Sequence, residues 1–438
     1  MSSKSKFLIG KKQVKNLLQS LQKRTRTKKF WAALVVSISI LVSIWLVFFR
    51  NKKSSLNNLT AKAKSLFSTQ SLPNHTILFI DLLEGFGEAE MSIVDGKVSA
   101  PYIEKQIDFA ATEGLDGILI AIPIDHVYRN SPDTPDWTGV EHVFNYAHEK
   151  GLFILSKLRL EPYKSYLYPD FNISDFVQGN TSVKLESDFW VTYAKKFATD
   201  YKEKFQEWHT SNRILCVFPT STIHQEWGYG YDTPLHESSY GERIKAVNRV
   251  MHEMADVLSP LSVGVDSGSY YDTAAATHRG TCAVTDLANR PNIVCVKDNP
   301  HIDYDLYFDH ALLLSTAKKN GANGLAMAEH TNSPPGQVTP QLIDDIRLSY
   351  ELGIDIVGLA FVYDEAGHQI VRDIVNALKQ SNHYRRPKPT WSPVGEFSYT
   401  TSELKNQNGY QGQILTRFRN LLQQNANKLP TITVINDL

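Results

Sequence analysis

Two acidic side chains stand at places where a protein rarely puts a charge. Glu226 lies in HQEWGYG, residues 224–230, shortly after the apolar run RILCVFP. Glu329 closes the run GLAMAE, in which five small or apolar residues precede it. A carboxylate at the end of a buried run is partly desolvated, and such groups are typical acids, bases and nucleophiles of active sites.

The neighbours of Glu226 are side chains that a sugar-binding site uses. Trp227 and Tyr229 offer flat apolar faces on which the C–H groups of a pyranose ring can stack, and Gln225 offers an amide for a hydroxyl. The alternative is a packed loop in which Glu226 forms a surface ion pair. We favour the functional interpretation, because Glu329 occupies a matching position later in the chain.

Five further side chains are weaker candidates for contacts to a substrate. Lys157 and Arg159 lie in a third apolar run and could bind a hydroxyl or carboxylate, although such residues serve as often in structural ion pairs. Trp137, His301 and His330 could line the same cleft, or could be packed and hydrogen-bonded. The sequence lacks the cysteine and histidine spacings typical of zinc sites, so we expect neither a metal nor a cofactor.

The elements around these residues predict a (β/α)8 TIM barrel. Eight apolar runs are continuous rather than alternating, as in parallel strands covered on both faces. They cover residues 76–83, 117–124, 152–160, 214–219, 261–266, 292–297, 324–329 and 355–362. Helical patterns follow at residues 101–113, 139–150, 188–209, 241–258, 273–289, 304–319, 339–352 and 365–380. A doubly wound sheet seldom needs so many regular units, which favours the barrel.

Reactive groups of such barrels lie at the C-terminal ends of the strands. Glu226 follows the fourth predicted strand, and Glu329 ends the seventh. Carboxyl groups on these strands can approach the ~5–5.5 Å that a retaining glycosidase requires. One carboxylate then attacks the anomeric carbon, while the other protonates the leaving oxygen and later activates water.

A Glu after strand four and a Glu at the end of strand seven of a (β/α)8 barrel resembles clan A of the glycoside hydrolases. The resemblance covers roughly residues 76–380 and includes QEWGYG, which is similar to the clan's Asn-Glu stretch. It implies that Glu226 is the acid/base and Glu329 the nucleophile. Gln225 stands where the clan usually has the asparagine that binds the sugar 2-hydroxyl.

The N-terminal part predicts a transmembrane signal anchor. From Phe30 to Phe49 the sequence FWAALVVSISILVSIWLVFF has 20 residues without a charge, enough to span a hydrocarbon layer of ~30 Å. Ten Lys and Arg residues lie in residues 4–29 but five in residues 50–64, which places the N-terminus in the cytoplasm and exports the rest. A buried core helix or a cleaved signal peptide is the alternative; the long basic region and the missing cleavage pattern disfavour a signal peptide.

Composition bounds the remaining possibilities. Lys+Arg and Asp+Glu both number 46 in 438 residues, so no net charge favours a nucleic acid partner. Three cysteines do not make a disulfide framework. The predicted parts are a basic cytoplasmic arm (1–29), the anchor (30–49), a stalk (50–75), the barrel (76–380) and a C-terminal extension (381–438) with a loop-like stretch at 385–398 and one amphipathic helix.

These features predict a membrane-anchored glycosidase that cleaves a cell-surface or exopolysaccharide glycan with retention. Its barrel would lie in the periplasm, in a lumen or outside the cell, and residues 30–49 would contact the lipid bilayer. Two alternatives stay open: a non-catalytic carbohydrate-binding or scaffold barrel, which Gln225 favours, and a barrel enzyme of other chemistry, such as a metal-dependent hydrolase. The separation of the two carboxyl groups discriminates, since ~5–6 Å indicates retention, ~6.5–9.5 Å inversion, and more than about 12 Å the binding barrel.

Overall fold

The computed structural model describes most of the chain after residue 71. The described residues are 72–82, 92–94, 97–128, 130–131, 133–160, 188–220, 249–250, 252–266, 293–298, 305–319, 324–330, 339–360, 365–400, 403 and 413–435. The predicted arm, anchor and most of the stalk lie outside them. Among the helices of the described ranges, none is both long and apolar enough to cross a bilayer. Residues Thr69–Leu438 form one compact unit.

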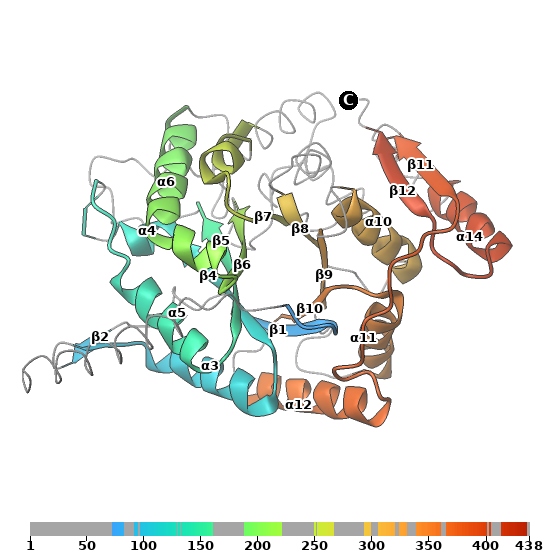
Figure 1. The fold of residues 1–438 in the computed structure, drawn as a ribbon, viewed down its shortest axis with the longest axis horizontal. Helices are drawn as coiled ribbons and strands as arrows, with labels where there is room; N and C mark the ends of the chain where they lie inside the picture. The colour runs from blue at the N-terminus through green and yellow to red at the C-terminus, as the bar shows by residue number, and fades with distance from the viewer. Residues whose placement is uncertain are drawn as a thin grey trace, which may run out of the picture. The chain divides into compact units, whose positions relative to one another are not determined.

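Eight parallel strands close into a barrel (Figure 1). In chain order they are β1 (Ile77–Leu82), β4 (Gly117–Pro123), β5 (Phe153–Arg159), β6 (Ile214–Thr220), β7 (Val263–Asp266), β8 (Ile293–Asp298), β9 (Leu325–His330) and β10 (Ile356–Leu359). Each strand pairs with its neighbour in the chain order, and β10 pairs with β1 to close the barrel. Every strand begins within two residues of its predicted run, so the predicted (β/α)8 barrel is confirmed.

Helices lie between the strands and surround the barrel (Figure 1). They are α3 (Pro101–Glu113), α4 (Ile124–Val127), α5 (Thr138–Glu149), α6 (Asp188–Thr210), α10 (Leu306–Lys318), α11 (Pro340–Leu352) and α12 (Glu365–Gln380). Residues 249–250 and 252–258 are also helical, and the predicted helix at 273–289 lies outside the described residues. Helices α3 and α11 end where their predicted ranges end, and Gly114 and Gly353 cap them with left-handed φ angles of 79° and 82° that suit glycine.

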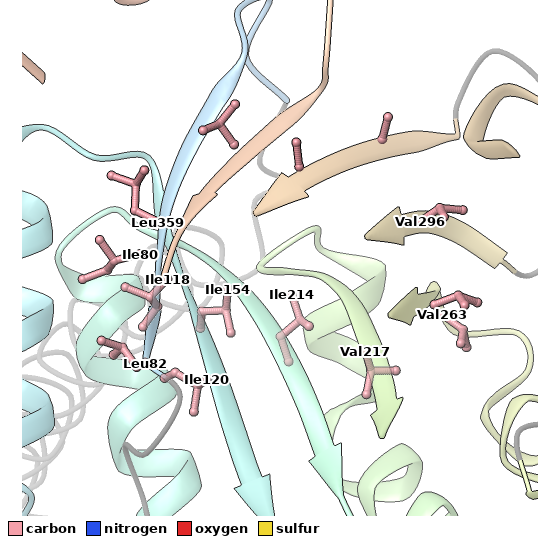
Figure 2. Close-up of a cluster of buried hydrophobic side chains, with 14 of the residues drawn as sticks. Ile80, Leu82, Ile118, Ile120, Ile154, Ile214, Val217, Val263, Val296 and Leu359 are labelled. Atoms are coloured by element: carbon pink, nitrogen blue, oxygen red, sulfur yellow. The ribbon is translucent and has the colours of Figure 1, made fainter. Parts of the chain in front are cut away.

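The strands bury two separate apolar surfaces. One cluster contains strand residues alone and fills the barrel interior: Ile77, Phe79, Leu119, Phe153, Leu155, Leu215, Cys216, Phe218, Cys295, Met327 and Ile356. The alternate residues face outward and pack with the helices, and Figure 2 labels several of them, from Ile80 on β1 to Leu359 on β10. Burial on both faces explains why the runs are continuous in hydrophobicity.

The C-terminal extension folds into a small unit against α10. It contains β11 (Glu396–Thr400), α14 (Leu415–Gln424) and β12 (Thr431–Ile435), and the two strands are parallel. Phe418 packs on Phe308 with ring centroids 5.0 Å apart, and the backbone N–H of Ile432 donates to Ser315 Oγ at 2.7 Å.

The sequence interpretation needs correction in two places. Residues 385–398 were predicted as loop, yet β11 begins inside them, and β12 after the helix was not predicted at all. A short antiparallel pair, β2 (Ser92–Val94) with β3 (Lys97–Ser99), was also not predicted. All four strands are short, and the pairing of β11 with β12 joins segments on either side of a helix, which local patterns do not reveal.

Candidate active site

Charged side chains lie above the apolar interior of the barrel. They follow members of the interior cluster by two or four residues along a strand, and because inward-facing residues alternate, they face the same interior nearer the C-terminal ends. They are Asp81 on β1, Lys157 and Arg159 on β5, and Glu329 on β9, and each is between 0% and 2% exposed. We call these four residues the inner polar layer.

An ion pair connects two members of this layer. Lys157 Nζ donates a hydrogen bond to Asp81 Oδ2 at 3.0 Å, and neither side chain is exposed. Burial of this kind weakens dielectric screening, so each charge depends strongly on the other. The pair links β1 to β5 across the intervening β4. The structure therefore gives Lys157 the ion-pair role that the sequence left open beside substrate binding.

Glu329 has unusual surroundings on one side. It is the next-to-last residue of β9 and stands in register with Gly358 of β10. A Cβ atom on Gly358 would lie 3.5 Å from both Cβ and Cγ of Glu329, and 2.9 Å from Met327 Cε. Glycine inside a strand often marks such a close approach. The neighbouring strand thus places no side chain beside the catalytic candidate.

Arg159 extends the inner polar layer toward the rim of the barrel. It is the last residue of β5, two positions beyond Lys157, and is among the largest fully buried side chains of the described part. Its rigid fork of N–H donors suits a carboxylate or a pair of hydroxyl groups. The predicted role of Arg159 as a substrate contact stays a prediction.

Two predicted substrate contacts, His330 and Trp137, lie outside the barrel interior, on the side of the helices. His330 follows Glu329 and therefore points to the opposite face of β9, where its Nε2 lies 2.9 Å from Ser349 Oγ on α11. Trp137 belongs to the outer apolar cluster and stacks on Phe197 of α6, with ring centroids 6.0 Å apart. The structure does not bring His330 or Trp137 together with the inner polar layer.

The other predicted site residues lie outside the described residues. These are Gln225, Glu226, Trp227 and Tyr229 after β6, and His301 after β8. The separation of the Glu226 and Glu329 carboxyl groups therefore stays a prediction.

Two residues of the site were not among the predicted contacts. Asp81 was not assigned to the site, although alternation from Phe79 places it inside the barrel. Gly358 interrupts the apolar run IVGL, and a strand glycine was the available signal for close approach.

Solved structures of other proteins share this architecture. A GH5_18 protein from Streptomyces cattleya, solved in complex with GlcNAc, has a TM-score of 0.52 and 11% identity, covering 84% of this chain and 94% of that chain. At this level of identity the likeness shows the (β/α)8 fold that the two chains share. A GH5_18 protein from Bifidobacterium longum subsp. longum has a TM-score of 0.53 and 12% identity, covering 83% of this chain and 92% of that one. A β-galactosidase from Rahnella sp. R3 has a TM-score of 0.58 and 10% identity, covering 85% and 66%.

Sequence comparison contributes little beyond this. No protein-family model matches the chain. The inhibin beta chain of Drosophila melanogaster is 32% identical over 85 residues, which are 19% of this chain and 8% of that protein. The chain thus spans less than a tenth of that relative's length, and so short a stretch carries no functional argument.

Proposed function

We propose that the chain is a retaining glycosidase in which Glu329 is the nucleophile and Glu226 the acid/base. One observation carries the proposal: Glu329 is 2% exposed at the C-terminal end of β9, the seventh strand of a barrel with glycoside hydrolase fold. Active sites of (β/α)8 barrels lie at this end of the strands. A carboxylate is rarely buried unless it has charged or hydrogen-bonding partners or a functional role.

The reaction proceeds in two displacements at the anomeric carbon. A carboxylate oxygen of Glu329 attacks this carbon while Glu226 gives its proton to the leaving glycosidic oxygen. Glu226, now a carboxylate, removes a proton from water, and the water oxygen displaces Glu329 with net retention. Arg159 donates hydrogen bonds to a hydroxyl or carboxylate of the sugar, and the Asp81–Lys157 pair holds β1 and β5 together beneath the site.

The products of hydrolysis test this function. The full chain is incubated with a panel of cell-surface glycans and exopolysaccharides, and the anomeric proton of the first product is followed by NMR. We expect the configuration of the substrate to be retained. Inversion would contradict the predicted short separation of the two carboxyl groups but leave a glycosidase. Tight binding without any cleavage would support the carbohydrate-binding barrel, for which Gln225 is the specific argument.

The space beside Glu329 gives a second test. We expect Gly358→Leu to lower kcat/KM by about 10²-fold, because its side chain would occupy the place next to Glu329 and displace the reacting groups. Gly358→Ala is the matched control. Its added Cβ meets chiefly the flexible end of Met327, so we expect less than about a tenfold loss. Equal kinetics of wild type and Gly358→Leu would show that no substrate atom enters this space.

We also propose that the segment from Phe30 to Phe49 anchors the protein in a membrane, with the barrel on the exported side. The support is the uncharged run and the excess of Lys and Arg before it. Protease added outside intact cells or spheroplasts should release or digest the barrel, while the N-terminal arm survives. Protection of the barrel until the membrane is permeabilised would contradict this topology.

A further inference from the structure

Two buried histidines and a serine connect β9 to the helices on either side of it in the chain. His330 of β9, His310 of α10 and Ser349 of α11 are 3%, 1% and 0% exposed. Ser349 Oγ lies 2.9 Å from His330 Nε2 and 2.7 Å from His310 Nε2. The other ring nitrogen of His310, Nδ1, lies 2.6 Å from the carbonyl oxygen of Leu306. We call His330, Ser349 and His310 the histidine–serine network.

The positions of the protons in this network follow from its acceptors. A backbone carbonyl can only accept, so His310 Nδ1 must carry a proton and donate it to Leu306. Burial lowers the pKa of His310 to about 4, so near neutral pH the ring is uncharged and its Nε2 is a bare acceptor. The single hydroxyl proton of Ser349 has two acceptors within reach, Nε2 of His310 at 2.7 Å and the carbonyl oxygen of Asp345 at 3.2 Å. The bare Nε2 of His310 is the nearer acceptor and needs a donor, so the proton points to His310, and Ser349 Oγ accepts from Nε2–H of His330.

His330 is thus neutral and protonated on Nε2. Burial is the largest cause that lowers its pKa to about 3, and the nearby His310 lowers it further, while Glu329 opposes the shift. Every hydrogen bond of the network is then donated in the same direction. His330 on β9 donates to Ser349 on α11, Ser349 donates to His310 on α10, and His310 donates to the carbonyl oxygen of Leu306 in the first turn of α10. Such an arrangement fixes the ring of His330 in one orientation.

The network acts at the end of β9, next to the position where the neighbouring strand β10 has a glycine. Gly358 places no side chain beside Glu329, and the residue before Glu329 on the outer face is the small Ala328. His330 is the last residue of the strand, and its carbonyl oxygen also accepts a hydrogen bond from Ala360 N at 3.1 Å. The outer side chain that follows Glu329 is therefore well placed to fix the strand end.

We propose that His330 is a positioning residue for Glu329: through the directed hydrogen bonds of the histidine–serine network it fixes the end of β9 and so the place of the nucleophilic carboxylate. The proposal rests on the proposed function. Its mechanism is rigidity, because a displacement of about 1 Å of a reacting group can lower turnover about 10²-fold.

Removing the bridging hydroxyl tests the proposal. Ser349→Ala in the full chain should lower kcat by about 10- to 100-fold and leave KM within about twofold. Ser315→Ala is the matched control, because Ser315 is also a buried serine on a helix. Its hydroxyl donates to the carbonyl oxygen of Ala311 and accepts from the backbone N–H of Ile432, and neither residue belongs to β9. We expect kcat of the control to be unchanged. Equal losses in both variants would overturn the proposal.

Two substitutions of His330 separate positioning from folding. His330→Gln keeps an N–H donor near the place of Nε2 and should retain most of kcat, whereas His330→Leu should lose it like Ser349→Ala. Equal activity of the glutamine and leucine variants would contradict a hydrogen-bonded role. These two variants also answer the question if Ser349→Ala fails to fold.

A spectroscopic measurement needs no turnover. With 15N-labelled histidine, NMR should show His310 protonated on Nδ1 and His330 on Nε2, and the opposite tautomers would overturn the proposal.

If the wild type cleaves no glycan, the proposed function fails by itself. The network is then tested by the 13C titration curve of the Glu329 carboxyl group, which Ser349→Ala should shift and Ser315→Ala should not. Identical curves in all three proteins would refute positioning.

Discussion

Glu329→Gln should remove nearly all turnover, by more than about 10³-fold in kcat, while the affinity for oligosaccharide stays close to that of the wild type. The amide has almost the same shape as the carboxylate, so sugar contacts persist. The amide cannot form the covalent glycosyl intermediate, so the two-step reaction is blocked at its first step. Steady-state kinetics and calorimetric titration with an oligosaccharide measure the two quantities on the same preparation.

The companion substitution Glu226→Gln should give a graded loss. Substrates with poor leaving groups need protonation and should lose most of their rate, whereas an activated aryl glycoside should still release its aryl group. Azide should rescue Glu226→Ala and give a glycosyl azide of retained configuration. If Glu329→Gln cleaves glycosides as fast as the wild type, Glu329 is not the nucleophile.

The barrel could be predicted because its signals are local. Continuous apolar runs identified all eight strands, and the helical patterns between them gave the bounds of helices such as α3 and α11. The C-terminal unit could not be predicted in the same way. β11 and β12 have five residues each, carry exposed residues, and are held by contacts to α10 that only tertiary structure supplies.

The part of the site that lies on the strands could be predicted from the alternation of inward-facing and outward-facing residues along each strand. Glu329, Lys157 and Arg159 share the inward side with their apolar neighbours two or four residues earlier. His330 and Trp137 were selected for their chemistry alone. A residue directly after Glu329 must face the helices, so period two already separates His330 from the inner polar layer. Trp137 precedes a helix whose packing on α6 is visible only in three dimensions.

The buried ion pair leads to the largest expected change in stability. Asp81→Asn should lower the free energy of unfolding by about 3–5 kcal/mol, because it leaves the fully buried Lys157 ammonium without its carboxylate. Lys157→Met should lower it by a similar amount for the reverse reason. Urea unfolding of the full chain in detergent, followed by circular dichroism, measures both. Lys195→Ala is the control, since its pair with Glu253 is largely exposed and should contribute less than about 1 kcal/mol.

The double variant Asp81→Leu with Lys157→Met decides what the pair is for. Replacing both charges by apolar groups of similar size should restore most of the lost stability, because no charge is left buried alone. If the restored protein also regains wild-type kcat on a glycoside, the pair serves only to join β1 and β5. If it is stable but keeps a low kcat, the Lys157 ammonium acts on the substrate as well. Failure of the double variant to recover stability would contradict the ion pair as the cause of the single losses.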